Sequence, residues 1–161
     1  MTFAALFIAY IVAQRLVELV IARRNMAALL AAGAEERFPR HYPLIVAVHA
    51  GWIAALVILG WDNAVHLGWL GAYAAIQLLR FWTLASIGRR WTTRILVVPG
   101  ETLVARGPYR FIPHPNYMVV IAEILVAPLV LGLPVVAAVF SALNAAVLVI
   151  RVRAEERALD R

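Results

Sequence analysis

Cysteine is absent from the 161-residue sequence. Without it the chain has no disulfide framework, no thiolate metal site and no cysteine nucleophile. The histidines lie apart, at positions 41, 49, 66 and 114. None of them forms the i, i+3 or i, i+4 pair expected of a metal site on a helix. These absences exclude thiol chemistry and argue against a metal enzyme.

The chain also has too few polar residues for a soluble domain. Hydrophobic residues make up 64% of the chain, and the mean hydropathy is +0.84. A soluble domain is about 45–50% apolar. Five segments approach the roughly 20 apolar residues that cross a bilayer as a helix: residues 2–22, 43–60, 64–85, 116–131 and 135–151. We therefore predict an all-α integral membrane bundle of about five transmembrane helices, and the length allows a single domain over residues 1–161.

The first apolar segment is not typical of a signal peptide. No basic residue precedes it, and Arg15 and Glu18 interrupt its apolar run. We expect a retained first helix. The following segment, residues 25–42, contains "EERFPRHYP" and is predicted to be a loop with at most an interfacial helix. The segment 116–131 is short for a full span.

Arginine is distributed unevenly among the connections. Four arginines follow the first helix, five follow the third and three lie in the tail after the fifth, whereas the two remaining connections have none. Basic loops face the cytoplasm, so this pattern predicts an outside N-terminus and a cytoplasmic C-terminus. The same rule accounts for the net charge of +6 without nucleic-acid binding.

Ionisable and amide side chains occur inside the predicted spans. Arg15 and Glu18 share a face of the first helix, Arg80 lies in the third, Glu123 in the fourth and Asn144 in the fifth. Such groups are costly in hydrocarbon and usually face a bundle interior. Two interpretations stay open. The groups are structural ion pairs, within helix one and between Arg80 and Glu123, or they border a site that opens to the cytoplasm.

One polar, proline-rich stretch stands out before the fourth span, "RGPYRFIPHPNY" at residues 106–117. It offers Tyr109, His114 and Asn116 as hydrogen-bonding groups, and the tail offers Arg151 and Glu155. Together they are typical of a site for a zwitterionic or nucleoside-like ligand. Glutamates at the end of a last helix are also often merely solvated.

The stretch "GETLVARGPYRFIPHPNY", followed by "RVRAEERAL", resembles the isoprenylcysteine carboxyl methyltransferase family of integral membrane enzymes. The shared pattern is Gly-x-Tyr, a short spacer, His-Pro-x-Tyr, and later an arginine with a glutamate pair on the last helix. The resemblance implies S-adenosylmethionine as the cofactor. Two positions depart from the pattern or are doubtful: Pro113 stands where arginine is usual, and Glu101 matches a variable position.

The resemblance implies a role for each matching residue. Thr102, Leu103 and Val104 would line the cofactor, and Glu155 would bind it from the tail. Arg151 would face the methyl acceptor, and Glu123 is a second candidate catalytic residue. An ordinary phenol acceptor would need a base, and either His114 or Glu123 could serve. The residues expected to hold the methionine or adenosine portion are Tyr109, His114, Pro115, Asn116 and Tyr117.

The longer segment from Arg80 to Glu123, including "TTRI" and "HPNY", looks like a small bacterial branch of the family. Members of that branch often accompany type III polyketide synthases and methylate alkylpyrones or phenolic lipids. This resemblance implies a multi-pass enzyme of the bacterial inner membrane, with its active site facing the cytoplasm. It also implies membrane-lipid contact, an acceptor that enters from the bilayer, and a functional link to such a synthase.

Other functions remain open. Within the same enzyme class, the acceptor could instead be a prenylcysteine-type carboxylate or a phospholipid amine. Outside that class, the chain could be a membrane scaffold or a lipid-binding partner protein without catalytic activity.

Overall fold

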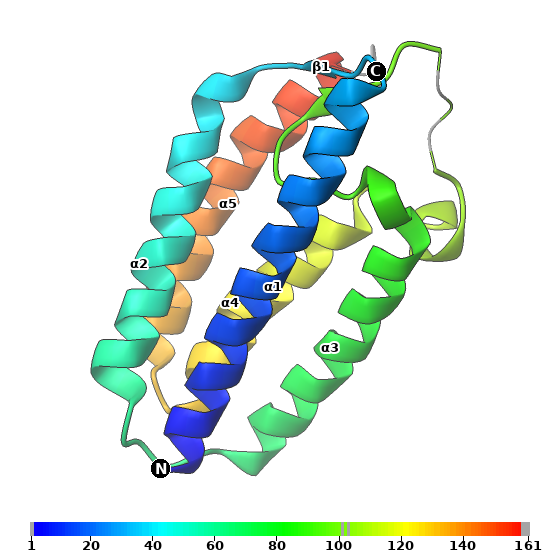
Figure 1. Ribbon diagram of the computed structural model, residues 1–161. Helices are drawn as coiled ribbons and strands as arrows, with labels where there is room; N and C mark the ends of the chain where they lie inside the picture. The colour runs from blue at the N-terminus through cyan, green and yellow to red at the C-terminus, as the bar shows by residue number, and fades with distance from the viewer. Residues whose placement is uncertain (1, 101, 103, 159–161) are drawn as a thin grey trace.

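The structure is a computed structural model that describes residues 2–100, 102 and 104–158 (Figure 1). The described chain forms α1 (Phe3–Ala31), α2 (Tyr42–Gly60), α3 (Leu67–Ile87), α4 (Pro115–Val130) and α5 (Pro134–Ala158). These helices confirm the predicted all-α bundle. The connections 32–41 and 88–114 and the last turns of α5 gather at one end, here called the loop end. The start of α1 and the connection between α2 and α3 lie at the opposite end.

The outer surface of the bundle suits a lipid solvent. Four helices are long and apolar enough to cross a membrane, and only α4 is shorter. With its 16 residues, α4 reaches about 24 Å against a hydrocarbon core of about 30 Å. Phe3, Ile58 and Leu67 are 83%, 77% and 78% exposed. Apolar side chains can face outward in this way because lipid tails do not penalise them. The outside location of the N-terminus remains a prediction.

The first helix is longer than the sequence predicted. It was expected to end near residue 22, but it continues to Ala31. The added stretch, residues 25–31, is rich in alanine, leucine and methionine, which are strong helix formers, and contains no glycine or proline. Gly33, at φ 91°, ends the helix, and the N–H of Ala34 donates to the Leu29 carbonyl at 3.0 Å. The predicted loop therefore shrinks to residues 32–41.

Two further boundaries differ from the prediction. The third helix starts at Leu67 rather than at residue 64, because polar groups before it bond elsewhere. The Asn63 Nδ2 donates to the Leu131 carbonyl at 2.8 Å, and the His66 N–H donates to the Val130 carbonyl at 2.9 Å. At the other end of the chain, α5 continues through the charged tail to Ala158.

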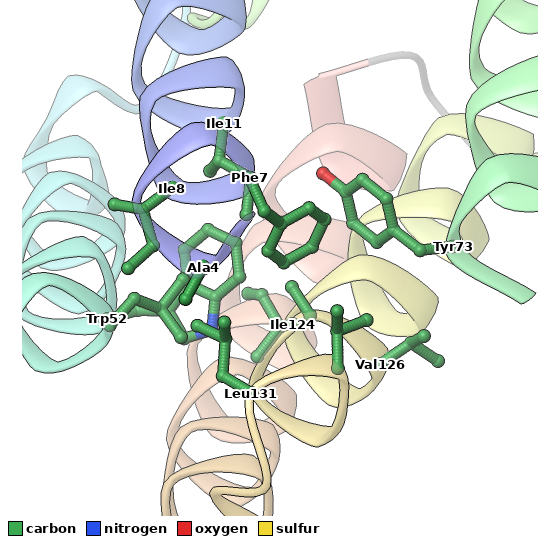
Figure 2. Close-up of a cluster of buried hydrophobic side chains, with 12 residues drawn as sticks. Ala4, Phe7, Ile8, Ile11, Trp52, Tyr73, Ile124, Val126 and Leu131 are labelled. Atoms are coloured by element: carbon green, nitrogen blue, oxygen red, sulfur yellow. The ribbon is translucent and has the colours of Figure 1, made fainter. Parts of the chain in front are cut away.

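A hydrophobic core fills the bundle towards the end opposite the loop end (Figure 2). Phe7 of α1 meets Tyr73 of α3 edge to face, with ring centroids 5.0 Å apart. Trp52 of α2 and Ile124 of α4 are fully buried in the same cluster. Because apolar packing is concentrated there, the loop-end half of the bundle is left to polar groups and cavities.

Short elements join the two connections at the loop end. Strand β1 (Glu35–Glu36) pairs antiparallel with β2 (Leu96–Val97). The Asn25 Nδ2 of α1 donates to the Trp91 carbonyl at 2.8 Å. Three 3₁₀ helices complete the described elements: η1 (Pro39–His41), η2 (Gly88–Arg90) and η3 (Gly107–Arg110). These contacts hold the segment 88–114 against the ends of α1 and α3.

Gly107 generates a prediction about how this segment is attached. Its φ is +58°, and an added Cβ would lie 2.0 Å from the Ser86 Oγ of α3. Replacement Gly107→Ala should lower the free energy of unfolding by roughly 2–4 kcal/mol, because left-handed strain and a steric clash add. Denaturant unfolding in detergent measures the loss.

Gly33→Ala is the matched control for the Gly107 variant. Gly33 has φ +91°, but an added Cβ there would meet no atom within 4 Å. The control should lose only the strain, roughly 1–2 kcal/mol. Equal losses in the two variants would contradict the close packing of Gly107 on Ser86.

Candidate functional site

A cavity of about 580 Å³ opens at the loop end, between the segment 88–114 and the ends of α4 and α5. It is called the loop-end cavity below. Eight of the residues that the sequence predicted for a site line it: Thr102, Val104, Tyr109, His114, Asn116, Tyr117, Arg151 and Glu155. The structure thus brings the loop and the tail to one place, and the individual roles of these residues stay predictions.

The remaining predicted residues lie elsewhere. Pro115 occupies the first turn of α4, where its missing N–H costs no helix hydrogen bond, and it is buried. Glu123 is fully buried further along α4. Neither of them lines this cavity or the second cavity described below. Leu103 and Glu101 lie outside the described residues.

Tyr117 is the centre of a polar network in the loop-end cavity. Its hydroxyl donates to Glu155 Oε2 and accepts from Arg151 Nε at 2.9 Å. Arg151 also donates from Nη1 to the Thr93 carbonyl at 2.8 Å. The His114 ring stacks on the Tyr117 ring, with centroids 5.2 Å apart, and His114 Nδ1 lies 3.8 Å from Glu155 Oε1. The network ties α4 to α5 and fixes the direction of each side chain.

A second cavity, of about 240 Å³, lies deeper among the helices. It is called the inner cavity below. Its apolar lining comes from α1, α2, α4 and α5: Leu19, Ile45, Val46, Ile53, Val120, Val147 and Leu148. Both cavities are lined by Trp91, Thr92, Asn116, Tyr117 and Arg151, so these residues form their common wall, called the junction below.

Asn116 holds a free hydrogen-bonding atom at the junction. Its Oδ1 is buried and has no hydrogen-bond partner among the described residues. A buried polar atom without a partner is costly, so such atoms usually have a ligand or water in the functional state. Asn116 as a residue lines both cavities, so this oxygen lies close to both of them.

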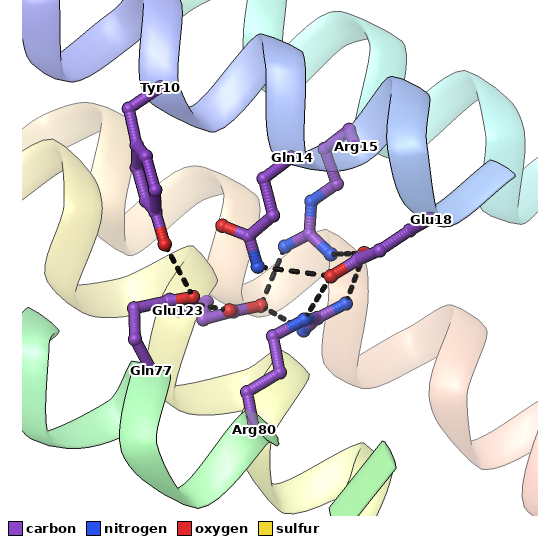
Figure 3. Close-up of polar contacts among 7 residues, drawn as sticks. All are labelled: Tyr10, Gln14, Arg15, Glu18, Gln77, Arg80 and Glu123. Carbon is purple, nitrogen blue, oxygen red and sulfur yellow. Dashed lines mark hydrogen bonds and ion pairs between the residues drawn. The ribbon is translucent and has the colours of Figure 1, made fainter. Parts of the chain in front are cut away.

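Four charged residues form an ion cluster where α1, α3 and α4 meet (Figure 3). Arg80 donates to Glu18 from Nε and Nη2, both at 2.5 Å, and to Glu123 Oε2 at 2.5 Å. Arg15 donates to Glu18 Oε2 at 3.1 Å and to Glu123 Oε2 at 2.6 Å. Gln77 supplies a donor to Glu123 Oε1 at 2.8 Å.

The ion cluster combines the two interpretations left open by the sequence. The Arg15–Glu18 pair within α1 and the Arg80–Glu123 pair between helices both exist as structural pairs. Yet Arg15, Glu18 and Arg80 also line the inner cavity. Each oxygen of Glu123 already accepts a hydrogen bond, which leaves this carboxylate poorly placed to take a proton from a ligand.

Burial changes the acidity of Tyr109 in the loop-end cavity. Removal from water raises the pKa of its phenol to about 12, and the nearby Glu155 carboxylate adds to the shift. An unperturbed tyrosine has a pKa of about 10. Tyr109 therefore stays a neutral hydroxyl throughout the physiological range and can donate a hydrogen bond to a ligand.

Some residues at the junction were not among the predicted site residues. Thr92 lines both cavities, and the Thr93 carbonyl holds Arg151. The signal that could have identified them is the "TTRI" motif, which already belonged to the resemblance. His49 of α2 lines the inner cavity, and nothing in its sequence context marked it.

Helices suited to a membrane, with a polar cavity at one end and an apolar one between them, define a helical membrane protein with two adjoining internal cavities. Residues 69–161 match the Isoprenylcysteine carboxyl methyltransferase (ICMT) family. The chain belongs to this family, whose members are membrane methyltransferases that use S-adenosylmethionine.

Two curated proteins are similar to the chain along its whole length. The "Uncharacterized protein YpbQ" of Bacillus subtilis (strain 168) is 42% identical over 160 residues, covering 96% of this chain and 95% of that protein. An "Uncharacterized protein" of Haemophilus influenzae (strain ATCC 51907 / DSM 11121 / KW20 / Rd) is 26% identical over 167 residues, covering 99% and 96%. No solved structure shows a significant match to the chain.

The ion cluster leads to a prediction for Glu123→Gln. The change keeps a polar group beside Gln77 but leaves two arginines opposite one glutamate, so the free energy of unfolding should fall by roughly 3 kcal/mol. Adding Arg15→Met restores the charge balance, so the double variant should lose less than the sum of the single variants. Denaturant unfolding in detergent of the wild type, the two single variants and the double variant gives the double-mutant cycle. Losses of unfolding free energy that simply add would contradict a coupled cluster.

The pKa of Tyr109 leads to a pH-dependent prediction. Between about pH 10 and about pH 12, Tyr109 is ionised in the unfolded chain but still protonated in the folded chain. The unfolded state therefore binds fewer protons there, and the free energy of unfolding falls as pH rises. Tyr109→Phe should remove part of this fall, measured by unfolding across that window. An identical pH dependence in the variant would contradict the burial of the phenol.

Proposed function

We propose that the chain is an S-adenosylmethionine-dependent integral membrane O-methyltransferase. The acceptor is a lipophilic small molecule, such as an alkylpyrone or a phenolic lipid. The meeting of the two cavities at Asn116, Tyr117 and Arg151 carries the proposal. Transfer between a water-soluble cofactor and a membrane-dissolved acceptor needs two compartments with a common wall, where the reacting atoms can align.

The residues of the loop-end cavity fit S-adenosylmethionine. A volume of about 580 Å³ suits a ligand of this size. Glu155 and the free Asn116 Oδ1 can accept hydrogen bonds from an ammonium group or from ribose hydroxyls, and Tyr109 can donate one. Apolar groups beside them, such as Ile95 and Val98, offer a surface for a purine ring. When bound, the cofactor supplies a methyl group on a sulfonium, which is a good leaving group.

The chain's contribution at the junction is alignment and charge. The Arg151 guanidinium is held by Tyr117 and Thr93, so its position is set before a ligand arrives. A fixed cation at the transfer point attracts an anionic oxygen and repels an amine that is protonated. This favours an enolate, phenolate or carboxylate over a phospholipid amine. For an acceptor that is already ionised, no general base is required.

The location of the protein follows from the same proposal. The loop-end cavity lies at the end that holds most of the arginines in the connections, which the positive-inside rule assigns to the cytoplasm. The cofactor would enter from the cytoplasm of a bacterial cell, across the inner membrane surface, and the acceptor would enter from the bilayer. A type III polyketide synthase makes acceptors of this class and would supply the substrate.

Calorimetric binding of S-adenosylhomocysteine to the detergent-purified protein tests the cofactor site. The wild type should bind with micromolar affinity, and Glu155→Gln should weaken binding by about tenfold or more, because a charged acceptor is lost. Glu156→Gln is the matched control, since Glu156 lines neither cavity. It should bind like the wild type.

Two outcomes would contradict the proposed function. One is the absence of binding by well-folded wild type. The other is equal weakening in the Glu155 and Glu156 variants, which would indicate a general charge effect of the tail rather than a site. The His114→Ala variant adds a check from the loop side and should also bind more weakly, because His114 stacks on Tyr117.

A further inference from the structure

The outer face of α3 changes character along its length. Helix α3 packs mainly on α4, so its far side faces away from the bundle (Figure 1). Exposed residues recur on that side at helical spacing, at positions 78, 81, 82, 85 and 89. Leu78 and Phe81 come first and are 74% and 72% exposed, Trp82 follows, and Arg89 lies beyond the last turn. The order is that of a membrane edge, where tryptophan lies between apolar groups and basic ones.

A second arginine reaches the same place from the segment before η3. Arg106 Nε donates to the Ser86 carbonyl of α3 at 2.8 Å. A Cβ added at Gly88, the residue before Arg89, would lie 3.9 Å from Arg106 Nη2. The guanidinium therefore lies at the C-terminal end of α3, where the helix dipole favours a cation. No other hydrogen bond or ion pair occupies Arg106 within the described ranges, so the N–H donors of its Nη groups are available to a ligand.

The indole N–H of Trp82 lies close to the same spot. Ser86 follows Trp82 by one helical turn, and its Oγ donates to the Trp82 carbonyl at 2.7 Å. A Cβ added at Gly107, the residue after Arg106, would lie 3.3 Å from Trp82 Nε1. Among the described residues, no hydrogen bond uses this Nε1. An indole N–H and a guanidinium can only donate, so the surface presents donors and positive charge to whatever lies against it.

The protein does not balance the positive charge of this face. Arg89 and Arg106 are both exposed, and neither forms an ion pair with a carboxylate in the part of the chain that the structure describes. The face is also separate from the two cavities, since Trp82, Arg89 and Arg106 line neither of them. A ligand bound here is therefore neither the cofactor nor the acceptor of the proposed reaction, and a negative charge is what it must bring.

The depth of these groups fits a lipid headgroup. Seven helical residues span about 10 Å, so Trp82 and Arg89 lie about 10 Å apart along the axis of α3. The polar layer on each side of the hydrocarbon is about 5–8 Å thick, so these two residues bracket one layer of headgroups. Leu78 and Phe81 lie below that layer, in the hydrocarbon. An anion from solution would contact the arginines alone, whereas a phospholipid would contact the apolar residues as well.

We propose that this face binds an anionic phospholipid, and it is called the α3 lipid site below. Its residues are Leu78, Phe81, Trp82, Arg89 and Arg106. The phosphodiester accepts from the Trp82 indole N–H and the Arg106 Nη groups, and an acyl chain lies along Leu78 and Phe81. A headgroup with a net negative charge is favoured, because each basic residue at a membrane surface attracts it. A zwitterionic lipid offers the same phosphate but carries a cation that the arginines repel.

Native mass spectrometry of the detergent-purified protein tests the α3 lipid site. It measures the affinity for the first bound lipid, with dioleoyl phosphatidylglycerol compared with dioleoyl phosphatidylcholine. The wild type should prefer phosphatidylglycerol by roughly 10- to 30-fold, since each of the two arginines contributes about fivefold. Arg89→Gln and Arg106→Gln should each weaken phosphatidylglycerol binding by about fivefold. Trp82→Phe should weaken both lipids by about three- to tenfold, because the phosphate that loses a donor is common to both.

Two further variants separate the site from general charge and from loss of folding. Arg153→Gln removes another exposed arginine, on α5, that has no carboxylate partner in the described ranges, and it should bind both lipids like the wild type. Arg106→Lys keeps the charge and should retain most of the preference. Thermal unfolding gives a second readout, because phosphatidylglycerol should raise the unfolding temperature of the wild type more than that of Arg106→Gln.

Three outcomes would overturn the α3 lipid site. One is equal affinity of the wild type for the two lipids. Another is an equal loss in Arg106→Gln and Arg153→Gln, which would indicate a general attraction to the positive loop end. The third is displacement of phosphatidylglycerol by millimolar inorganic phosphate, since the face would then bind the anion without the acyl chain. None of these measurements depends on the proposed methyl transfer.

Discussion

The ion cluster is the contact on which the rest of this bundle depends. Arg80 reaches Glu18 on one neighbouring helix and Glu123 on another, so α1, α3 and α4 are linked by side chains that are almost entirely removed from water. Charged groups in such surroundings are tolerated only when every one of them is paired, which fixes the rotation of each helix. Because α4 is held in this way at Glu123, its first turn presents Asn116 and Tyr117 to both cavities.

The arrangement also separates two kinds of environment along the bundle axis. Apolar packing around Phe7, Trp52 and Ile124 fills the end opposite the loop end. The ion cluster follows, and the cavities open beyond it. The inner cavity is therefore bounded on that side by the paired side chains Arg15, Glu18 and Arg80, rather than by mobile lipid.

Hydropathy was sufficient to predict the helices, because a membrane span is a property of a continuous segment. It failed where tertiary contacts or local propensity decided a boundary, as at the end of α1 and the start of α3. The convergence of the loop and the tail was predicted from their hydrogen-bonding groups, and the resemblance added Thr102, Val104 and Tyr117 to the same cavity. The inner cavity could not be predicted in this way. Its wall combines residues from helices that are far apart in sequence. Whether a residue such as His49 lines a cavity depends on which helices pack beside it, and the sequence alone does not give that packing.

The two cavities draw on different parts of the chain. Leu29 is the one residue in the lining of the loop-end cavity, as far as the chain is described, that precedes residue 69, where the family match begins. In the inner cavity, α1 and α2 contribute Leu19, Ile45, Val46, His49 and Ile53, among others. Under the proposed function, the C-terminal part retains the chemistry, and the N-terminal helices select the molecule that receives the methyl group. Substitutions in α1 and α2 could then redirect an enzyme of this architecture to a new acceptor while its cofactor site stays the same.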